Sequence, residues 1–63
     1  MEDSKWKEHS DRIFLAISTG GFETYKEAEL AVIMFYLTDM SYSRAGICHA
    51  LKRLEKFYEE KQK

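Results

Sequence analysis

The sequence predicts an all-α fold: a three-helix domain in which the second and third helices form an antiparallel hairpin and the first helix packs across it. Three observations predict it. The 63 residues contain no proline, and Gly20-Gly21 is the one pair of adjacent glycines, so helix breakers are few. Apolar residues recur at helical spacing, and capping residues stand at the expected helix starts. We expect helices over 4–18, 25–39 and 43–60, within one domain of residues 1–63.

The first predicted helix begins at Asp3 or Ser4, either of which can cap its free N–H groups. Trp6, Ile13 and Ile17 lie near one face at a period of 3.6 residues. The helix should run to about Ser18 and end at Thr19-Gly20-Gly21, because glycine adopts a left-handed helix cap without steric penalty.

The second predicted helix contains eight consecutive apolar or aromatic residues, from Leu30 to Leu37. Thr24 and Glu27 have the spacing of a capping box, in which each side chain satisfies a backbone donor of the other residue. A strand is the alternative, favoured by Val32, Ile33, Phe35 and Tyr36. A helix is preferred because the segment is about 15 residues long, opens with a cap, and a lone strand would have nothing to pair with.

The third predicted helix begins at Ser41 or Ser43, after a short link that favours antiparallel neighbours. Its apolar stripe is formed by Ile47, Leu51, Leu54 and Tyr58, widened by Ala50 and Phe57. The opposite face carries His49, Arg53, Lys56 and Glu60 and is expected to face solvent.

The run from Leu30 to Leu37 is apolar around the whole helix, which indicates an element enclosed on every side. A domain of this size buries only about 60% of its unfolded surface, so it has little with which to enclose that run. We therefore predict a protein partner, with a homodimer as the expected assembly. The expected partner-binding residues are Leu30, Ile33, Met34, Leu37 and Tyr42.

Cysteine and histidine usage excludes several kinds of site. Cys48 is the single cysteine, which rules out a disulfide within the chain and suits a reducing cytoplasm. Cys48 and His49 are adjacent and diverge by about 100° on a helix, so they do not converge on a metal ion. We expect no metal and no cofactor. No signal peptide is visible, and the apolar run is too short to span a bilayer, which takes about 20 residues. The expected location is the cytoplasm.

Catalysis is not expected. A nucleophile needs a base and an orienting acid that converge in a pocket, and a three-helix domain of this size rarely encloses one. Gly20-Gly21 lacks the lysine and the preceding strand of a phosphate-binding loop.

Charge is unevenly distributed along the chain. Residues 1–43 carry a net charge of −4 and residues 44–63 a net charge of +3, for a total of −1. The segment from Met40 to Glu55 resembles the turn and recognition helix of helix-turn-helix regulators. It departs from that family at Phe35 and Asp39, where the family has a small residue and a glycine. The resemblance implies DNA binding as the alternative function, through Tyr42, Arg44, His49, Lys52, Arg53 and Lys56.

A second resemblance covers residues 32–60 and rests on Phe35, Tyr36, Asp39, Met40, Ala50, Leu54, Tyr58 and Glu59. With one inserted residue between Tyr36 and Asp39, this pattern is similar to short early proteins of lytic podophages that block bacterial cell division. The resemblance implies a small protein that binds and inhibits a host factor. The function expected from the sequence is therefore a non-enzymatic protein-binding regulator or inhibitor.

Overall fold

The structure, a computed structural model, describes residues 5–39 and 41–61 and places them in three helices. These are α1 (Lys5–Ser18), α2 (Tyr25–Thr38) and α3 (Arg44–Lys61), with no strand among the described residues. The predicted all-α three-helix class is confirmed, and the described helix boundaries differ from the predicted ones by no more than one residue. The predicted first-helix start at residue 4, its caps Asp3 and Ser4, and Met40 lie outside the described residues.

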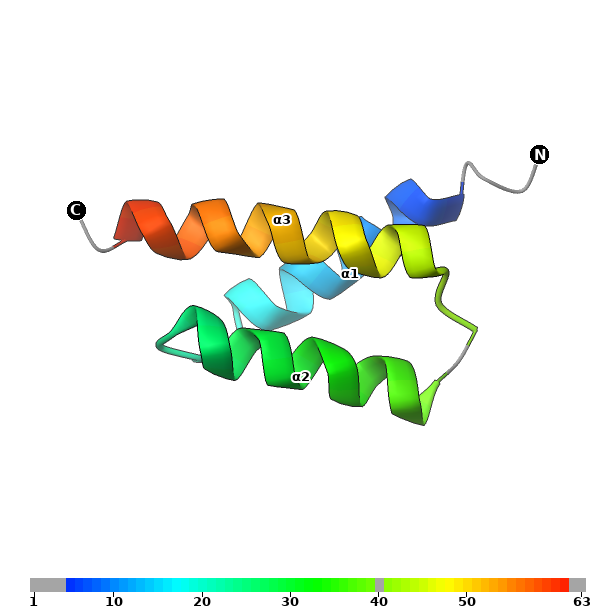
Figure 1. The fold of residues 1–63 in the computed structure, drawn as a ribbon, viewed down its shortest axis with the longest axis horizontal. Coiled ribbons are helices and arrows are strands. Elements are labelled where there is room, and N and C mark those ends of the chain that lie inside the picture. Colours follow the sequence, from blue (N-terminus) through cyan, green and yellow to red (C-terminus); the bar gives the residue numbers. More distant parts are fainter. Residues whose placement is uncertain (1–4, 40, 62–63) are drawn as a thin grey trace.

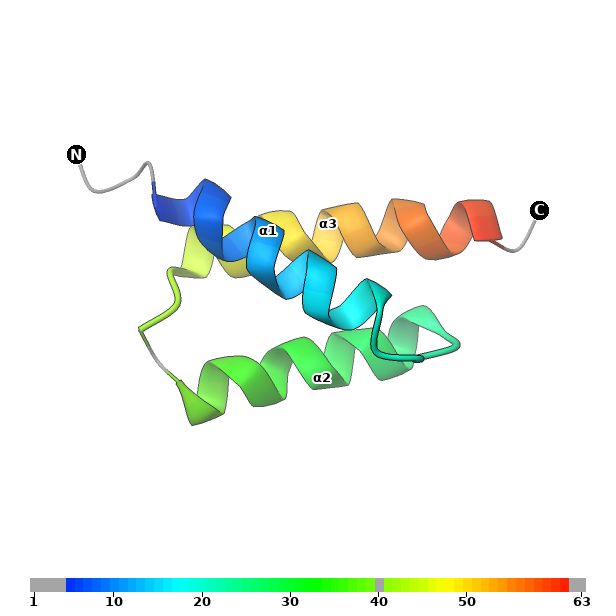
Figure 2. The ribbon, with the colours of Figure 1, turned by 180° about the vertical axis from the view of Figure 1, so that it is seen from behind.

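The three helices alternate in direction along the long axis of the molecule (Figure 1). α2 and α3 run in opposite directions, as predicted for the hairpin, and α1 crosses them diagonally on one side (Figure 2). α1 therefore begins beside the start of α3 and ends near the start of α2. α3 nevertheless packs more extensively against α1 than against α2.

Short-range hydrogen bonds explain where the helices begin and end. Gly21 has a φ of +86° in the turn after α1, a conformation that favours glycine. Thr24 Oγ1 accepts a hydrogen bond from the Glu27 N–H at 3.2 Å, as the predicted capping box requires. The return bond differs from the prediction, because Glu27 Oε1 accepts from the Glu23 N–H at 3.1 Å rather than from Thr24. The turn between the glycines and Thr24 brings that earlier donor into reach.

The start of α3 is fixed by Ser43 and by a contact with α1. Ser43 Oγ accepts from the Gly46 N–H at 3.0 Å, which selects Ser43 over Ser41 as the helix cap. The Ser43 N–H in turn donates to His9 Nδ1 at 2.8 Å. Gly46 is buried at this crossing, where a Cβ would lie only 2.7 Å from the His9 Cβ. A glycine here therefore allows α1 and α3 to approach closely.

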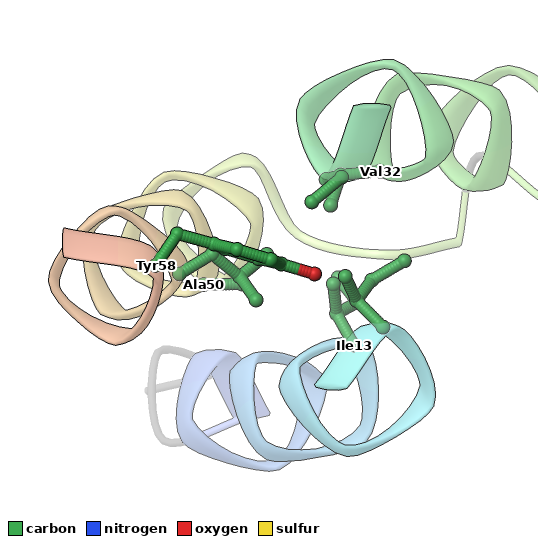
Figure 3. Packing of buried hydrophobic residues seen from close by; sticks show 7 residues of the cluster. Ile13, Val32, Ala50 and Tyr58 are labelled. Carbon is green, nitrogen blue, oxygen red and sulfur yellow. The ribbon is translucent and has the colours of Figure 1, made fainter. Parts of the chain in front are cut away.

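The core lies where the three helices face one another. Figure 3 shows Ile13 of α1, Val32 of α2, and Ala50 and Tyr58 of α3 converging, with the Tyr58 ring reaching toward the other two helices. The buried hydrophobic residues are Ile13, Ile17, Ala28, Val32, Ala50, Leu54 and Tyr58.

The buried row of α3 differs from the predicted stripe. Burial follows a spacing of four residues from Gly46 through Ala50 and Leu54 to Tyr58, whereas Ile47 and Leu51 are only partly buried. This row faces α1 because the glycine and alanine at its start let the two helices come close. Small residues therefore decide which face of α3 is buried.

Candidate protein-interaction surface

Helix α2 has two apolar faces, and only one of them contacts the core. Ala28 and Val32 are fully buried. On the other side, four large side chains are exposed by 43–64%. These four residues form what we call the outer face of α2: Leu30, Ile33, Met34 and Leu37.

Helix geometry explains why the four side chains gather. Positions separated by three, four and seven residues lie on one side of an α-helix. At about 100° per residue, the centre of this side lies about 150° around the helix from Val32. The run that the sequence presents as apolar on all sides is thus divided by the fold into a buried face and the outer face. The structure places all four predicted aliphatic partner-binding residues together on it.

Two hollows flank the outer face. The larger, of about 560 Å³, is lined by Phe22, Glu27, Leu30, Ala31, Met34 and Phe35. The smaller, of about 130 Å³, lies between α2 and α3 and is lined by Ile33, Tyr36, Arg44, Ile47 and Cys48. Both hollows share residues with the outer face, which therefore forms a ridge with a depression on each side.

The charged groups of α2 lie outside its outer face, and several stand at the ends of the helix. Lys26 and Glu27 are in its first turn, its last turn has no basic residue, and Asp39 follows as the C-terminal cap. Asp39 Oδ1 accepts hydrogen bonds from Ser41 Oγ at 2.6 Å and from the Ser41 N–H at 3.1 Å. These bonds, with the side-chain bond first, lower the pKa of the Asp39 carboxyl, so it stays negative.

Tyr42, the fifth predicted partner-binding residue, is not part of the outer face. Its ring packs edge-on against His9 of α1, with ring centroids 5.2 Å apart. Tyr42 is partly buried against the core. The structure therefore separates it from the four aliphatic residues of α2.

The residues of the alternative DNA-binding site fall into two groups. Arg53 and His49 contact α1: Arg53 Nη1 lies 2.6 Å from Asp11 Oδ1, and the His49 ring stacks on Trp6 at 4.1 Å. Tyr42 packs on His9, as described above. Arg44, Lys52 and Lys56 are exposed, and so are His49 and Arg53. The side of α3 that was expected to face solvent is therefore exposed, and α1 contacts part of it through His49 and Arg53.

A hollow of about 370 Å³ at the α1–α3 crossing, lined mainly by polar residues, was not predicted from the sequence. It is lined by Trp6, Lys7, Ser10, Asp11, His49 and Arg53. Ser10 is buried, and its Oγ accepts from Arg53 Nη1 at 3.3 Å. Since the hydroxyl, the carboxylate and the guanidinium satisfy one another, this hollow has the character of an interhelical contact.

The described residues contain neither a candidate metal-binding cluster nor a helix able to cross a membrane. Residues 5–39 and 41–61 contain no group of three or more His, Cys, Asp or Glu side chains arranged to hold a metal ion. Cys48 is exposed as a free thiol at the edge of the smaller hollow. In the same part of the chain, none of the helices combines the length and the hydrophobicity needed to cross a membrane.

The sequence analysis predicted the residues of the outer face but not the larger hollow beside it. Glu27, Leu30, Ala31 and Met34 follow the helical spacing 0, 3, 4 and 7, which places them around one point of the surface. Phe22 closes the hollow from the loop before α2, and sequence spacing does not reveal that loop contact. Comparisons with protein-family models, with curated proteins and with solved structures gave no match.

Proposed function

We propose that this protein is a non-enzymatic regulator or inhibitor that acts by protein–protein contact, with the outer face of α2 as its contact surface. The observation that carries the proposal is the exposure of Leu30, Met34 and Leu37 by 58%, 60% and 64%. These side chains adjoin one another with Ile33 between them. An exposed apolar patch beside a small core is typical of protein interaction sites.

The chemistry of the surface supports binding rather than catalysis. Aliphatic side chains lose water favourably when a partner covers them, at roughly 25 cal/mol per Å². They neither transfer protons nor attack a substrate. Met34 adds a flexible side chain that adapts to differently shaped partners.

The remaining parts of the proposal come from the sequence. The resemblance to short early phage proteins supports a phage-encoded inhibitor whose target is a bacterial host factor. The single cysteine supports a cytoplasmic protein.

DNA binding through α3 is the alternative, and the exposure of Arg44, Lys52 and Lys56 is the observation that favours it. It is the weaker proposal, because His49 and Arg53 already contact α1. A gel-shift assay at low salt tests it, since phosphate contacts are strongest there. A shift that disappears in Lys52→Glu/Lys56→Glu would support DNA binding, and no shift at low salt would eliminate it.

The proposed function is tested by a pair of matched variants. Leu37 on α2 and Leu15 on α1 are the same residue type and are both 64% exposed. The wild-type protein, Leu37→Glu and Leu15→Glu are immobilised and incubated with a bacterial lysate, and the retained proteins are identified by mass spectrometry. We expect a specific protein to be retained by the wild type and by Leu15→Glu and lost with Leu37→Glu, since a charge in an apolar interface is costly.

Circular dichroism of both variants verifies that each remains helical. Equal retention by the two variants would contradict the assignment of the contact surface to α2. Retention of no specific protein by the wild type would contradict the proposal of a bacterial target.

A further inference from the structure

We propose that the outer face of α2 binds the same face of a second copy of this protein, with the two α2 helices packed antiparallel about a two-fold axis. This inference rests on the proposed function, in which that face is a protein contact surface, and a second copy and a target protein would compete for it. Three features of the outer face favour a second copy as its occupant: the symmetry of its spacing, the position of the larger hollow, and the charges at the helix ends.

The spacing of the outer face reads the same in both directions. Its residues follow one another at intervals of three, one and three, so the pattern is symmetric about a point between Ile33 and Met34. A two-fold axis through that point places Leu30 opposite Leu37 of the second copy and Ile33 opposite Met34. Each large side chain then meets another, as an isologous interface requires.

The larger hollow lies where this pairing requires a hole to receive a side chain of the second copy. In helix pairs, an apolar side chain inserts into a hole formed by four residues of the facing helix. Glu27, Leu30, Ala31 and Met34 line the hollow and have the spacing of such a hole. In the antiparallel arrangement, Leu37 of the second copy lies opposite Leu30, at the edge of this hole. Leu37 is 64% exposed and therefore accessible for insertion.

The charges at the ends of α2 select the antiparallel orientation. Lys26 extends the outer face toward the helix start, and Glu27 lies at the edge of that face beside the larger hollow. The other end of α2 has no basic residue in its last turn and is followed by Asp39. Antiparallel pairing brings Lys26 beside the helix C-terminus of the second copy, where a cation complements the helix dipole. Parallel pairing would place the two Lys26 side chains together and repel them.

The size of the molecule bounds the size of the interface. A specific interface covers about one tenth of a small protein's surface, and for a solvent-accessible surface of 4779 Å² two such patches total roughly 1,000 Å², at the low end for a specific interface. We therefore expect a dimer that forms at micromolar concentrations.

The first test is sedimentation equilibrium from about 1 µM to about 1 mM, a range that brackets micromolar dissociation constants. We expect a monomer–dimer equilibrium for the wild type and for Leu15→Glu. In Leu37→Glu the dissociation constant should rise by at least about a hundredfold, because both copies place a charge in the interface. A monomeric wild type throughout this range would overturn the inference.

The second test fixes the orientation without a destabilising charge. Cys48 is the single cysteine, so Cys48→Ser provides a thiol-free background. Leu30→Cys and Leu37→Cys are introduced separately, mixed in equal amounts and equilibrated in a glutathione redox buffer. Antiparallel pairing predicts that the mixed 30–37 disulfide exceeds its statistical share of one half. An excess of 30–30 and 37–37 disulfides would overturn the proposed orientation.

The two proposals fail in different ways. A monomeric wild type that still retains a lysate protein through Leu37 overturns the self-association and leaves the proposed function standing. A dimer that depends on Leu37, together with no retained protein, supports the self-association and removes the bacterial target.

Discussion

Tyr58 connects the C-terminal helix to the turn before α2. Its side chain is buried, and its hydroxyl donates a hydrogen bond to the Phe22 carbonyl oxygen at 2.7 Å. Burial first, and the nearby Glu27 carboxylate second, raise the pKa of the Tyr58 phenol above its ordinary value of 10.0. One residue therefore supplies core volume and also satisfies a backbone acceptor outside its own helix.

We expect Tyr58→Phe to lower the free energy of unfolding at pH 7 by about 1–2 kcal/mol, because the Phe22 carbonyl loses its donor. The folded-state pKa of Tyr58 is raised, so its contribution is fully present below pH 10 and is lost as the pH rises through that raised pKa. The difference in free energy of unfolding between wild type and Tyr58→Phe should become smaller above pH 10. Urea unfolding at pH 7 and at strongly alkaline pH measures the free energy of unfolding of both proteins. The same difference at both pH values would contradict the role assigned to the Tyr58 hydroxyl.

Gly46 reverses the usual rule for glycine in a helix. Replacing a helical glycine with alanine normally stabilises by about 1 kcal/mol. At Gly46 the added Cβ would lie 2.7 Å from the His9 Cβ and 3.0 Å from the Trp6 carbonyl oxygen. We expect Gly46→Ala to destabilise by about 1–3 kcal/mol through overpacking, measured by thermal unfolding. A higher melting temperature for Gly46→Ala would show that α1 and α3 can move apart without loss of stability.

At the scale of the helices, α1 and α3 form the principal packed pair, and Arg53 spans their interface. Its guanidinium carbon lies 4.4 Å from the centre of the Phe14 ring, and its Nη1 contacts Asp11 and Ser10. Stacking and hydrogen bonding are combined here, as the planar guanidinium permits. Arg53, one of the residues predicted to contact DNA, therefore has a packing role.

We expect Arg53→Ala to lower the free energy of unfolding by about 1 kcal/mol, since exposed ion pairs and cation–π contacts each contribute up to roughly that amount. The neighbouring Lys52→Ala is the control. Lys52 is exposed and should change stability by less than about 0.5 kcal/mol. Equal losses of stability for Arg53→Ala and Lys52→Ala in urea unfolding would contradict a stabilising role of Arg53 between α1 and α3.

Helix α2 is the least firmly packed of the three. It contributes only Ala28 and Val32 to the buried core and shares smaller interfaces with its neighbours than α1 and α3 share with each other. We expect its amide hydrogens to exchange with solvent faster than those of α1 and α3, because lightly packed elements open at lower free energy. Hydrogen-exchange mass spectrometry checks this, and equal protection of all three helices would contradict it.

Sequence reasoning predicted the helices well because their ends are set by local signals. The glycine pair after α1, the Thr24 cap and the Ser43 cap each act within a few residues. The dominance of the α1–α3 interface was not predicted, since it depends on Gly46 meeting His9 from 37 positions away in the chain. The four exposed residues of α2 were predicted because helical spacing alone places them opposite the buried face.

For the whole molecule, the small core limits stability, and association offers a way to increase it. A dimer stabilises the folded state by mass action. If α2 pairs as proposed, the melting temperature of the wild type should rise with protein concentration, while that of Leu37→Glu should not. Differential scanning calorimetry at about 10 µM and about 500 µM measures this, with Leu15→Glu as the control. A wild-type melting temperature that is independent of concentration would contradict self-association.

The stacking of Trp6 on His49 provides an optical probe of folding. Trp6 is the only tryptophan in the chain, and its indole lies 4.1 Å from the imidazole at the α1–α3 crossing, nearly parallel to it. Intrinsic fluorescence therefore reports the separation of α1 from α3. Combined with the helical circular dichroism signal, it distinguishes a loosening of that crossing from the melting of α2 without an attached dye.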